Sequence, residues 1–450
     1  MNWRTFTISL VLVWLLFSLA LSRFARTGGS LAAPFDVPRN LANSKTILVP
    51  DNFEKIQDAI NNATEGSWVL VKSGIYYENI VVNKSVSLIG ESRSNTIIDA
   101  NMCSHVVTIL ANNVLISGFT LRNGGMSFPS YYGINVYNVD NSYIINNTII
   151  GNFVGIKLGD KLRGAFGHMI RDNNITKNRY GIFLDHSNSN IIYGNIVSEN
   201  KWNGIELAWC ERNVICANTI SANKAYGLEI YVSTPARYNV IYNNNFINNT
   251  FRTSVSGYVN VWDGGYPSGG NYWSDYDGMD SNFDGIGDTL YFIDENNQDN
   301  YPLMGMFSSF NTSYGYAVSF ISNSSISDVS FSLSPIEVYP PEAILAFNVS
   351  GVTDTEGFVR ICIPKILINS SYVVRFNGEI MTDTTYPQVK ELPCSNETHV
   401  YFYINYTHSE HTIDISGITA IPEFPSFLIL PLFMIATLLA VIIYRKKRIR

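Results

Sequence analysis

Residues 178–207 read NRYGIFLDHSNSNIIYGNIVSENKWNGIEL and contain one complete repeat of this chain. A Gly followed by an apolar residue recurs at Gly133, Gly155, Gly181, Gly204 and Gly227, with spacings of 22, 26, 23 and 23 residues. Apolar residues occupy the first and third positions after each Gly, so one face of each short strand points inward. Coils of this length predict an all-β parallel β-helix, whose rungs stack about 4.8 Å apart.

Asparagine marks the turns of the same repeat. It occurs 49 times in 450 residues, and two series of Asn share the period of the Gly series. Amide side chains at equivalent turns can bond the next rung and tolerate a left-handed backbone, so both series predict ladders. The series are Asn147, Asn173, Asn195, Asn218 and Asn244, and Asn152, Asn178, Asn200, Asn223 and Asn249.

An open solenoid has to cover its first rung. Residues 53–63 place apolar side chains at helical spacing and follow Asp51 and Asn52, either of which is a typical N-cap. We therefore predict an amphipathic capping helix over 53–63.

Several stretches outside the repeat resemble NosD-type right-handed parallel β-helix proteins, which belong to the carbohydrate-binding and sugar-hydrolysing β-helices. They are Ile56-Gln-Asp-Ala-Ile, Gly74-Ile-Tyr-Tyr-Glu-Asn, Lys84-Ser-Val-Ser-Leu-Ile-Gly and Gly270-Asn-Tyr-Trp-Ser-Asp-Tyr. The resemblance spans residues 45–305 and implies a right-handed β-helix with an Asp-rich C-terminal end. It also raises copper handling, although the one close His pair, His408 and His411, lies beyond the solenoid.

A second module occupies residues 308–418, where the Asn period stops and alternating strands separated by Pro, Gly and Asn begin. This pattern predicts a β-sandwich of Ig-like type that acts as a stalk.

The two ends predict export and anchoring. Residues 1–22 have the layout of a signal peptide, and 424–444 form an uncharged segment long enough to span a bilayer. The basic tail 445–450 would lie in the cytoplasm, with everything between the two segments on the extracellular side of the membrane. The Ile421-Pro-Glu-Phe-Pro-Ser run resembles an archaeal PEF-type sorting signal and implies archaeosortase processing.

Charge and sequons fit an extracellular protein. The whole chain carries a formal net charge of −7, which argues against nucleic acid as a partner. Without Arg4 and the tail, 24 basic residues face 37 acidic ones. Glycosylation sequons begin at Asn62, Asn83, Asn146, Asn174, Asn248, Asn311, Asn323, Asn348, Asn369, Asn396 and Asn405.

One outward row of the solenoid carries the candidate ligand site. Lys157, Glu206 and Glu229 occupy the second position after their Gly, and stacking the rungs aligns them. Asp185, His186, Trp209 and Tyr231 follow nearby in the same repeats. Acidic and aromatic side chains together suit a polysaccharide, and Glu206 with Glu229 could act as paired catalytic acids. The alternative is an ordinary solvated strip.

An Asp-rich segment resembles the first part of a calcium loop. Asp280, Asn282, Asp284, Asp288 and the carbonyl of Ile286 match the ligand positions, but Tyr291 replaces the final acid. We predict a structural calcium site here; the alternative is a solvated Asp/Gly turn.

Cysteines in an exported chain predict disulfides. Cys362 with Cys394, and Cys210 with Cys216, are the candidate pairs, which leaves Cys103, expected to be a buried thiol.

These observations predict a membrane-anchored surface protein whose solenoid binds cell-surface or environmental glycans or builds the envelope. A polysaccharide lyase or glycoside hydrolase is the second hypothesis, and copper delivery is the third.

Overall fold

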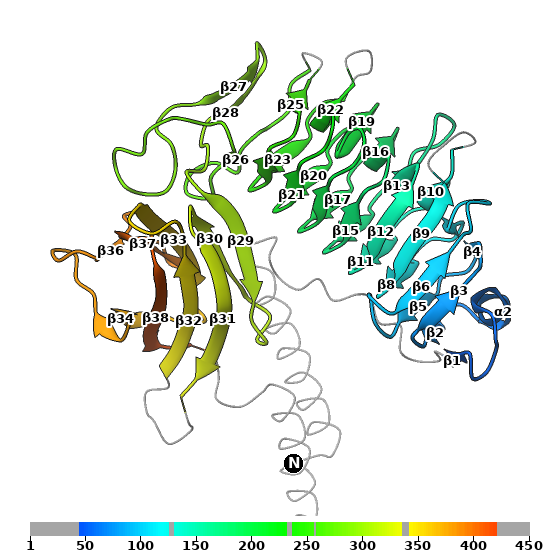
Figure 1. The fold of residues 1–450 in the computed structure, drawn as a ribbon, viewed down its shortest axis with the longest axis horizontal. Coiled ribbons are helices and arrows are strands. Elements are labelled where there is room, and N and C mark those ends of the chain that lie inside the picture. Colours follow the sequence, from blue (N-terminus) through cyan, green and yellow to red (C-terminus); the bar gives the residue numbers. More distant parts are fainter. Residues whose placement is uncertain (1–44, 126–129, 232–235, 256–257, 335–341, 421–450) are drawn as a thin grey trace, which may run out of the picture.

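Three parallel sheets wind into a solenoid that forms the N-terminal part of the molecule (Figure 1). The computed structural model describes residues 45–125, 130–231, 236–255, 258–334 and 342–420. Sheets A and B each contain nine strands and sheet C contains eight, and neighbouring strands of a sheet come from successive coils. The predicted parallel β-helix is confirmed.

The strands of the solenoid are short, and each coil contributes one strand to each sheet. Sheet A contains β1 (Thr46–Val49), β2 (Trp68–Val71), β5 (Ser87–Gly90), β8 (Leu115–Ser117), β11 (Tyr143–Ile145), β14 (Met169–Arg171), β17 (Ile191–Tyr193), β20 (Val214–Cys216) and β23 (Val240–Tyr242). Sheet B contains β3 (Gly74–Tyr76), β6 (Thr96–Asp99), β9 (Thr120–Gly125), β12 (Thr148–Asn152), β15 (Asn174–Thr176), β18 (Ile196–Ser198), β21 (Thr219–Ser221), β24 (Asn245–Ile247) and β26 (Tyr272–Trp273). Sheet C contains β4 (Ile80–Val82), β7 (Val107–Ile109), β10 (Tyr132–Val136), β13 (Val154–Leu158), β16 (Tyr180–Asp185), β19 (Ile205–Ala208), β22 (Tyr226–Ile230) and β25 (Phe251–Ser254).

A continuous apolar column fills the solenoid. Ile156, Ile182 and Ile205 pair in register on successive coils and are fully buried, as the spacing after Gly predicts. The repeated Gly itself is explained by close backbone approach, since a Cβ on Gly181 would lie 2.3 Å from the carbonyl oxygen of Gly204. Any larger residue at this position would push neighbouring coils apart.

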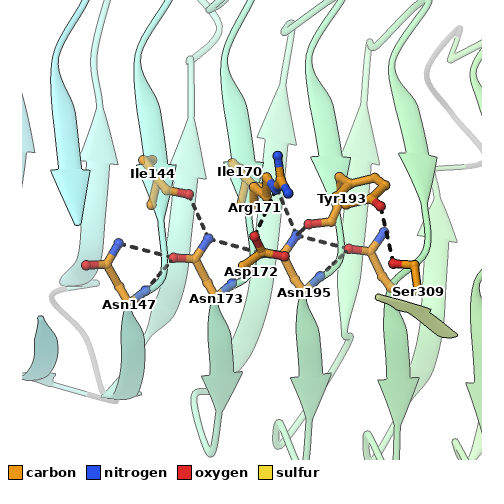
Figure 2. A network of polar contacts seen from close by, with 10 residues as sticks. Ile144, Asn147, Ile170, Arg171, Asp172, Asn173, Tyr193, Asn195 and Ser309 are labelled. Atoms are coloured by element: carbon orange, nitrogen blue, oxygen red, sulfur yellow. Dashed lines mark hydrogen bonds and ion pairs between the residues drawn. The ribbon is translucent and has the colours of Figure 1, made fainter. Parts of the chain in front are cut away.

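Both predicted Asn ladders form, and the structure adds a third. In the first, Asn195 Oδ1 accepts from the N–H and from Nδ2 of Asn173, both at 3.0 Å (Figure 2). Asn195 Nδ2 donates to Asn218 on the next coil at 3.0 Å and to the Ile170 carbonyl at 2.9 Å. The side-chain oxygen and nitrogen of a ladder Asn therefore both form hydrogen bonds within the wall of the solenoid. The third ladder comprises Asn190, Asn213, Asn239, Asn260 and Asn297.

The N-terminal coil is covered by α2 (Ile56–Asn62), which is shorter than the predicted helix over 53–63. Neither predicted N-cap serves it. The N-cap position is Lys55, and the carboxylate of Glu78 accepts from the N–H groups of Ile56 and Gln57 at 2.9 and 3.0 Å. An acid from the coil below thus replaces the local cap.

The C-terminal end of the solenoid is closed by aromatic rings and by the hairpin of β27 (Tyr291–Asp294) and β28 (Asn297–Asp299). The Trp273 ring stacks between Phe246 and Tyr291, at centroid distances of 4.4 and 4.3 Å. Asp299 ends the first ladder, because its carboxylate accepts from the Asn271 N–H at 2.7 Å and from the Trp273 indole at 2.9 Å.

Two five-stranded antiparallel sheets follow and pack face to face around one apolar core. The first contains β29 (Met306–Asn311), β30 (Ala317–Ser322), β33 (Glu356–Pro364), β36 (Gln388–Glu391) and β37 (His399–Thr407). The second contains β31 (Ser325–Leu333), β32 (Glu342–Ser350), β34 (Ser370–Phe376), β35 (Glu379–Ile380) and β38 (Glu410–Ile418). They form the predicted sandwich.

The sandwich docks against the C-terminal coils of the solenoid (Figure 1). Arg360 of β33 is 2% exposed and donates to the carbonyls of Asp284 and Pro267. Asn245 of β24 exchanges two hydrogen bonds with the backbone of Phe307, at 2.7 and 2.8 Å. The polar groups in both contacts would be costly to bury without partners. These contacts therefore fix the position of the sandwich on the solenoid.

The predicted signal peptide (1–22), membrane span (424–444) and basic tail (445–450) lie outside the described residues. Within the described ranges, no helix combines the length and apolar character needed to cross a bilayer.

Candidate functional site

The predicted outward row lies on the outer face of sheet C. Lys157 pairs with Phe183, Phe183 with Glu206, and Glu206 with Glu229 on successive strands. Neighbouring strands lie about 4.8 Å apart, so the two carboxyl groups are adjacent. The alignment expected from the repeat is therefore correct, and the chemistry depends on what surrounds these side chains.

Asn203 joins the two carboxylates. It lies one residue before Gly204, and its Nδ2 donates to Glu206 Oε2 at 3.0 Å and also to Glu229 Oε2. Its own Oδ1 accepts from the Tyr226 N–H at 3.2 Å. Asn203 was not among the residues predicted from the sequence. The signal was present, because the position before Gly holds Tyr132, Val154, Tyr180 and Tyr226 in the other coils, so Asn203 is the one amide at this position.

Burial sets the protonation of the pair. Glu206 is 4% exposed although it faces outward. Burial raises the pKa of Glu206 to about 7; the Asn203 hydrogen bond opposes this rise and the Glu229 carboxylate adds to it. Burial also raises the pKa of the less buried Glu229. Near neutral pH, Glu206 can therefore donate or accept a proton beside a carboxylate.

A buried ion pair lies beside the carboxylates. Lys157 Nζ is 3.1 Å from Asp185 Oδ2 and 3.8 Å from the centroid of the Phe183 ring. Burial lowers the pKa of Lys157, and the Asp185 carboxylate opposes that shift. The Lys157 ammonium group, the carboxylates and the Phe183 ring thus lie close together on the outer face of sheet C.

His186 and Trp209 lie at the corner where sheet C ends. His186 Nδ1 is 2.7 Å from Asp185 Oδ1, and its ring stacks on Trp209 with centroids 5.4 Å apart. Trp209 and Tyr231 are 44% and 41% exposed. The structure therefore brings all seven predicted ligand residues to one face and its edge.

An aromatic row that the sequence analysis did not identify lies at the opposite edge of sheet C. The Arg179 guanidinium lies 4.9 Å from the Phe153 ring and 5.0 Å from the Trp202 ring. Tyr180 follows at 5.5 Å from Trp202, which is 47% exposed. Phe153, Arg179 and Trp202 each lie two residues before Gly155, Gly181 and Gly204, which is the signal that could have found this row.

The Asp-rich turn holds its carboxylates on its own backbone. Asp280 accepts from the N–H groups of Asp284 and Gly285 at 3.0 and 2.7 Å, and Asp288 accepts from Ser281 at 2.7 Å. Arg360 Nη1 is 3.8 Å from Asp284 Oδ1, so a cationic side chain already faces the turn. Calcium binding at Asp280, Asn282, Asp284, Ile286 and Asp288 stays a prediction, which unfolding with Ca²⁺ and with a chelator would test.

The described residues do not fit a metal centre of the copper type. In the ranges that the structure describes, no three His, Cys, Asp or Glu side chains converge in a way that could hold an ion. The His pair is used for packing, since His408 contacts the hydroxyls of Ser324 and Thr355 at 2.7 and 2.6 Å.

Neither predicted disulfide forms in the structure, where all five cysteines are free thiols, and Cys103 is exposed rather than buried as expected. Cys210 lies in the solenoid core, whereas Cys216 ends β20 and lines the junction with the sandwich, so their side chains diverge. Cys362 and Cys394 lie in the same apolar cluster beneath the sandwich but remain unpaired, with Arg360 Nη2 3.9 Å from Cys394 Sγ.

Comparison with known proteins concerns the solenoid above all. Residues 60–278 match the family model described as periplasmic copper-binding protein (NosD), which is just under half of the chain. The solenoid is NosD-like. A cell surface glycoprotein of Methanothermus fervidus is 41% identical over 119 residues, which are 26% of this chain and 18% of that protein. The matched segment is thus a small part of the relative.

The likeness of the chain to solved structures is distant. A pectin methylesterase in complex with a hexasaccharide is 15% identical, with a TM-score of 0.34 over 47% of this chain and 81% of that chain. The periplasmic alginate epimerase AlgG is 19% identical, with a TM-score of 0.27 over 41% of this chain and 46% of that chain.

Proposed function

We propose that this protein is displayed on the cell surface and that its NosD-like solenoid binds a polysaccharide across the outer face of sheet C. The observation that carries the proposal is the bridge from Asn203 to the in-register carboxyl groups of Glu206 and Glu229. Sugar hydroxyls both donate and accept hydrogen bonds, and this cluster offers both kinds of partner.

The surroundings of the bridge support the same ligand class. Exposed rings flank it on both edges, with Trp202 on one side and Trp209 on the other. Apolar faces of sugar rings pack on such side chains while hydroxyls reach the polar groups between them. A ligand that runs along the solenoid would meet related groups on several coils.

Surface display rests on separate observations. The relative in Methanothermus fervidus is a cell surface glycoprotein, and the matched family is described as periplasmic. The apolar segment 424–444 would supply the anchor in the membrane, and archaeosortase would act at the preceding sorting signal.

A glycan array with purified full-length protein tests the proposal. We expect selective binding of one polysaccharide class, with a loss of about tenfold or more in Glu206→Gln and Asn203→Ala. Glu199→Gln is the matched control, since this acid of the same coil is exposed and pairs with Lys177 rather than with a group of sheet C. Equal binding by Glu206→Gln, Asn203→Ala and Glu199→Gln variants would refute the proposed site.

Catalysis on the same face is the second candidate, and the raised pKa of Glu206 favours it. A buried acid beside a carboxylate can protonate a leaving group while its partner acts as nucleophile or base. Release of reducing or unsaturated sugar ends that disappears in Glu206→Gln, with binding retained, would establish a hydrolase or lyase. No release from any bound polysaccharide would exclude it.

A further inference from the structure

A separate cavity of about 390 Å³ lies where the solenoid meets the sandwich. The solenoid contributes the ends of β17, β20 and β23 and the turns that follow them, and the sandwich contributes β29, β30, β33 and β37. Figure 2 shows one wall, where Tyr193 faces Ser309 of β29 beside the first Asn ladder. The volume lies within the range of small-molecule sites.

One buried polar atom in this cavity lacks a partner. Asn243 lines the cavity and is 9% exposed, and its Oδ1 is buried without a hydrogen bond. Its backbone is held elsewhere, with the N–H donating to the Gly270 carbonyl. An unpaired buried carbonyl oxygen costs about 1–3 kcal/mol. A ligand that donates a hydrogen bond here would remove that cost.

The rest of the lining defines the chemistry of the ligand. Tyr193 and Tyr242 from the solenoid face Phe307 and Tyr401 from the sandwich. Serine hydroxyls and amides lie between these rings. A lining of rings with a few polar groups suits a molecule that has both apolar faces and hydroxyls.

The lining favours an uncharged ligand. None of the described residues that line the cavity is Asp or Glu. Arg360 is already engaged by the carbonyls of Asp284 and Pro267, and burial lowers the pKa of His399, which keeps that ring neutral at pH 7. A charged ligand would find no free counter-charge.

We propose that the junction cavity is a second binding site, specific for a neutral sugar unit that donates a hydroxyl hydrogen bond to Asn243. The sugar has two possible sources of the same chemistry. One is a free saccharide, and the other is a glycan linked to the chain itself at Asn396, which lines the cavity and begins the sequon Asn396-Glu-Thr. Asn396 Oδ1 accepts from the N–H groups of Thr398 and His399 at 2.9 and 3.0 Å, which fixes the side chain there.

The test compares two identical substitutions in the full-length protein. Asn243→Gly removes the unpaired oxygen and suits the left-handed backbone, because φ of Asn243 is 55°. Asn138→Gly is the matched control. Asn138 also has a left-handed backbone, with φ of 58°, and a buried unpaired Oδ1, but it does not line the cavity.

The free-sugar arm uses neutral mono- and disaccharides of glucose, galactose, mannose and N-acetylglucosamine, with binding followed by saturation-transfer NMR and calorimetry. We expect binding by wild type, Asn138→Gly and Glu206→Gln, and affinity about tenfold lower in Asn243→Gly. Because Glu206→Gln disables only sheet C, this result is independent of the proposed function.

The linked-glycan arm uses mass spectrometry of the Asn396 peptide from protein made in an archaeal host that N-glycosylates. A glycan at Asn396 that endoglycosidase removes faster from Asn243→Gly than from Asn138→Gly supports the site. The proposal is overturned if no neutral sugar binds and Asn396 carries no glycan, or if Asn243→Gly matches Asn138→Gly in both arms.

Discussion

Asn203 shows how one amide organises the face of sheet C. Two carboxyl groups on adjacent rungs would repel each other if both were ionised, and the Asn203 amide compensates by donating to each. Burial favours the neutral form of Glu206, so the pair resembles one acid beside one carboxylate at neutral pH. Ionisation of the buried Glu206 therefore lowers the stability of the folded protein, and the size of this loss depends on pH.

Glu206→Gln should therefore stabilise the protein only at higher pH. The pKa of Glu206 is about 7 in the folded state against an ordinary value of 4.5 for a glutamate, so the stability lost to its ionisation grows between these pH values. At pH 4 both forms are neutral and the variant should match wild type. At pH 8 the variant should be more stable by up to about 3 kcal/mol.

Urea unfolding at the two pH values measures this difference. The exposed Glu199→Gln variant should stay within about 0.5 kcal/mol of wild type at both. An equal effect of Glu206→Gln at pH 4 and pH 8 would show that ionisation of the Glu206 carboxyl group does not destabilise the folded protein.

The sequence predicted part of this site and missed the rest for a physical reason. Strand alternation places Glu206 and Glu229 on the outer face, so their alignment follows from the Gly period alone. Asn203 lies in the bend before the strand, where alternation does not determine side-chain direction. The burial of Glu206 depends on side chains of its own and neighbouring coils, such as Asn203 and Phe183, and no local pattern predicts it.

At the scale of elements, the Asn ladders connect successive coils in the wall, as the apolar column connects them in the interior. Two ladders were predicted because their Asn residues recur with nearly the same period as the repeated Gly and stay five residues apart. The third, from Asn190 to Asn297, has irregular spacing and starts beside His168, whose N–H donates to Asn190 at 2.9 Å. The N-cap of α2 could not be predicted from the local sequence either, because the group that caps it is the Glu78 carboxylate from another coil.

Asn195→Ala should be strongly destabilising. It leaves the N–H of Asn173 without an acceptor, leaves Asn173 Nδ2 with the Ile144 carbonyl alone, and removes donors from the carbonyls of Ile170 and Tyr193. We expect a loss of about 3 kcal/mol or more in the free energy of unfolding. Lys201→Ala, an exposed change in the same coil, should cost less than about 0.5 kcal/mol. Chemical denaturation checks both, and equal small losses would mean the ladder contributes little.

At the scale of the whole molecule, the sandwich is docked on the solenoid through buried polar contacts. Arg360 is the central one, because its guanidinium reaches two carbonyls of the Asp-rich end and lies 5.2 Å from the Tyr401 ring. The sequence predicted two modules in the correct order. It could not predict their contact, because that contact joins residues far apart in the chain that share no repeat.

Arg360→Ala should uncouple the two parts. The loss of a buried, bonded guanidinium should cost about 3 kcal/mol at the junction and separate one unfolding transition into two. Arg375→Ala, which removes a half-exposed pair with Asp414 within the sandwich, should leave a single transition. Scanning calorimetry distinguishes these outcomes, and a single unshifted transition in Arg360→Ala would contradict the docking role.

The central claim is that the outer face of sheet C recognises a polysaccharide, and a crystal structure with the best array ligand tests it most directly. We predict a sugar chain over sheet C, with hydroxyls within hydrogen-bond distance of Asn203, Glu206 or Glu229 and a ring packed on Trp202 or Trp209. A saccharide found only away from sheet C, or the absence of any bound polysaccharide, would contradict the account.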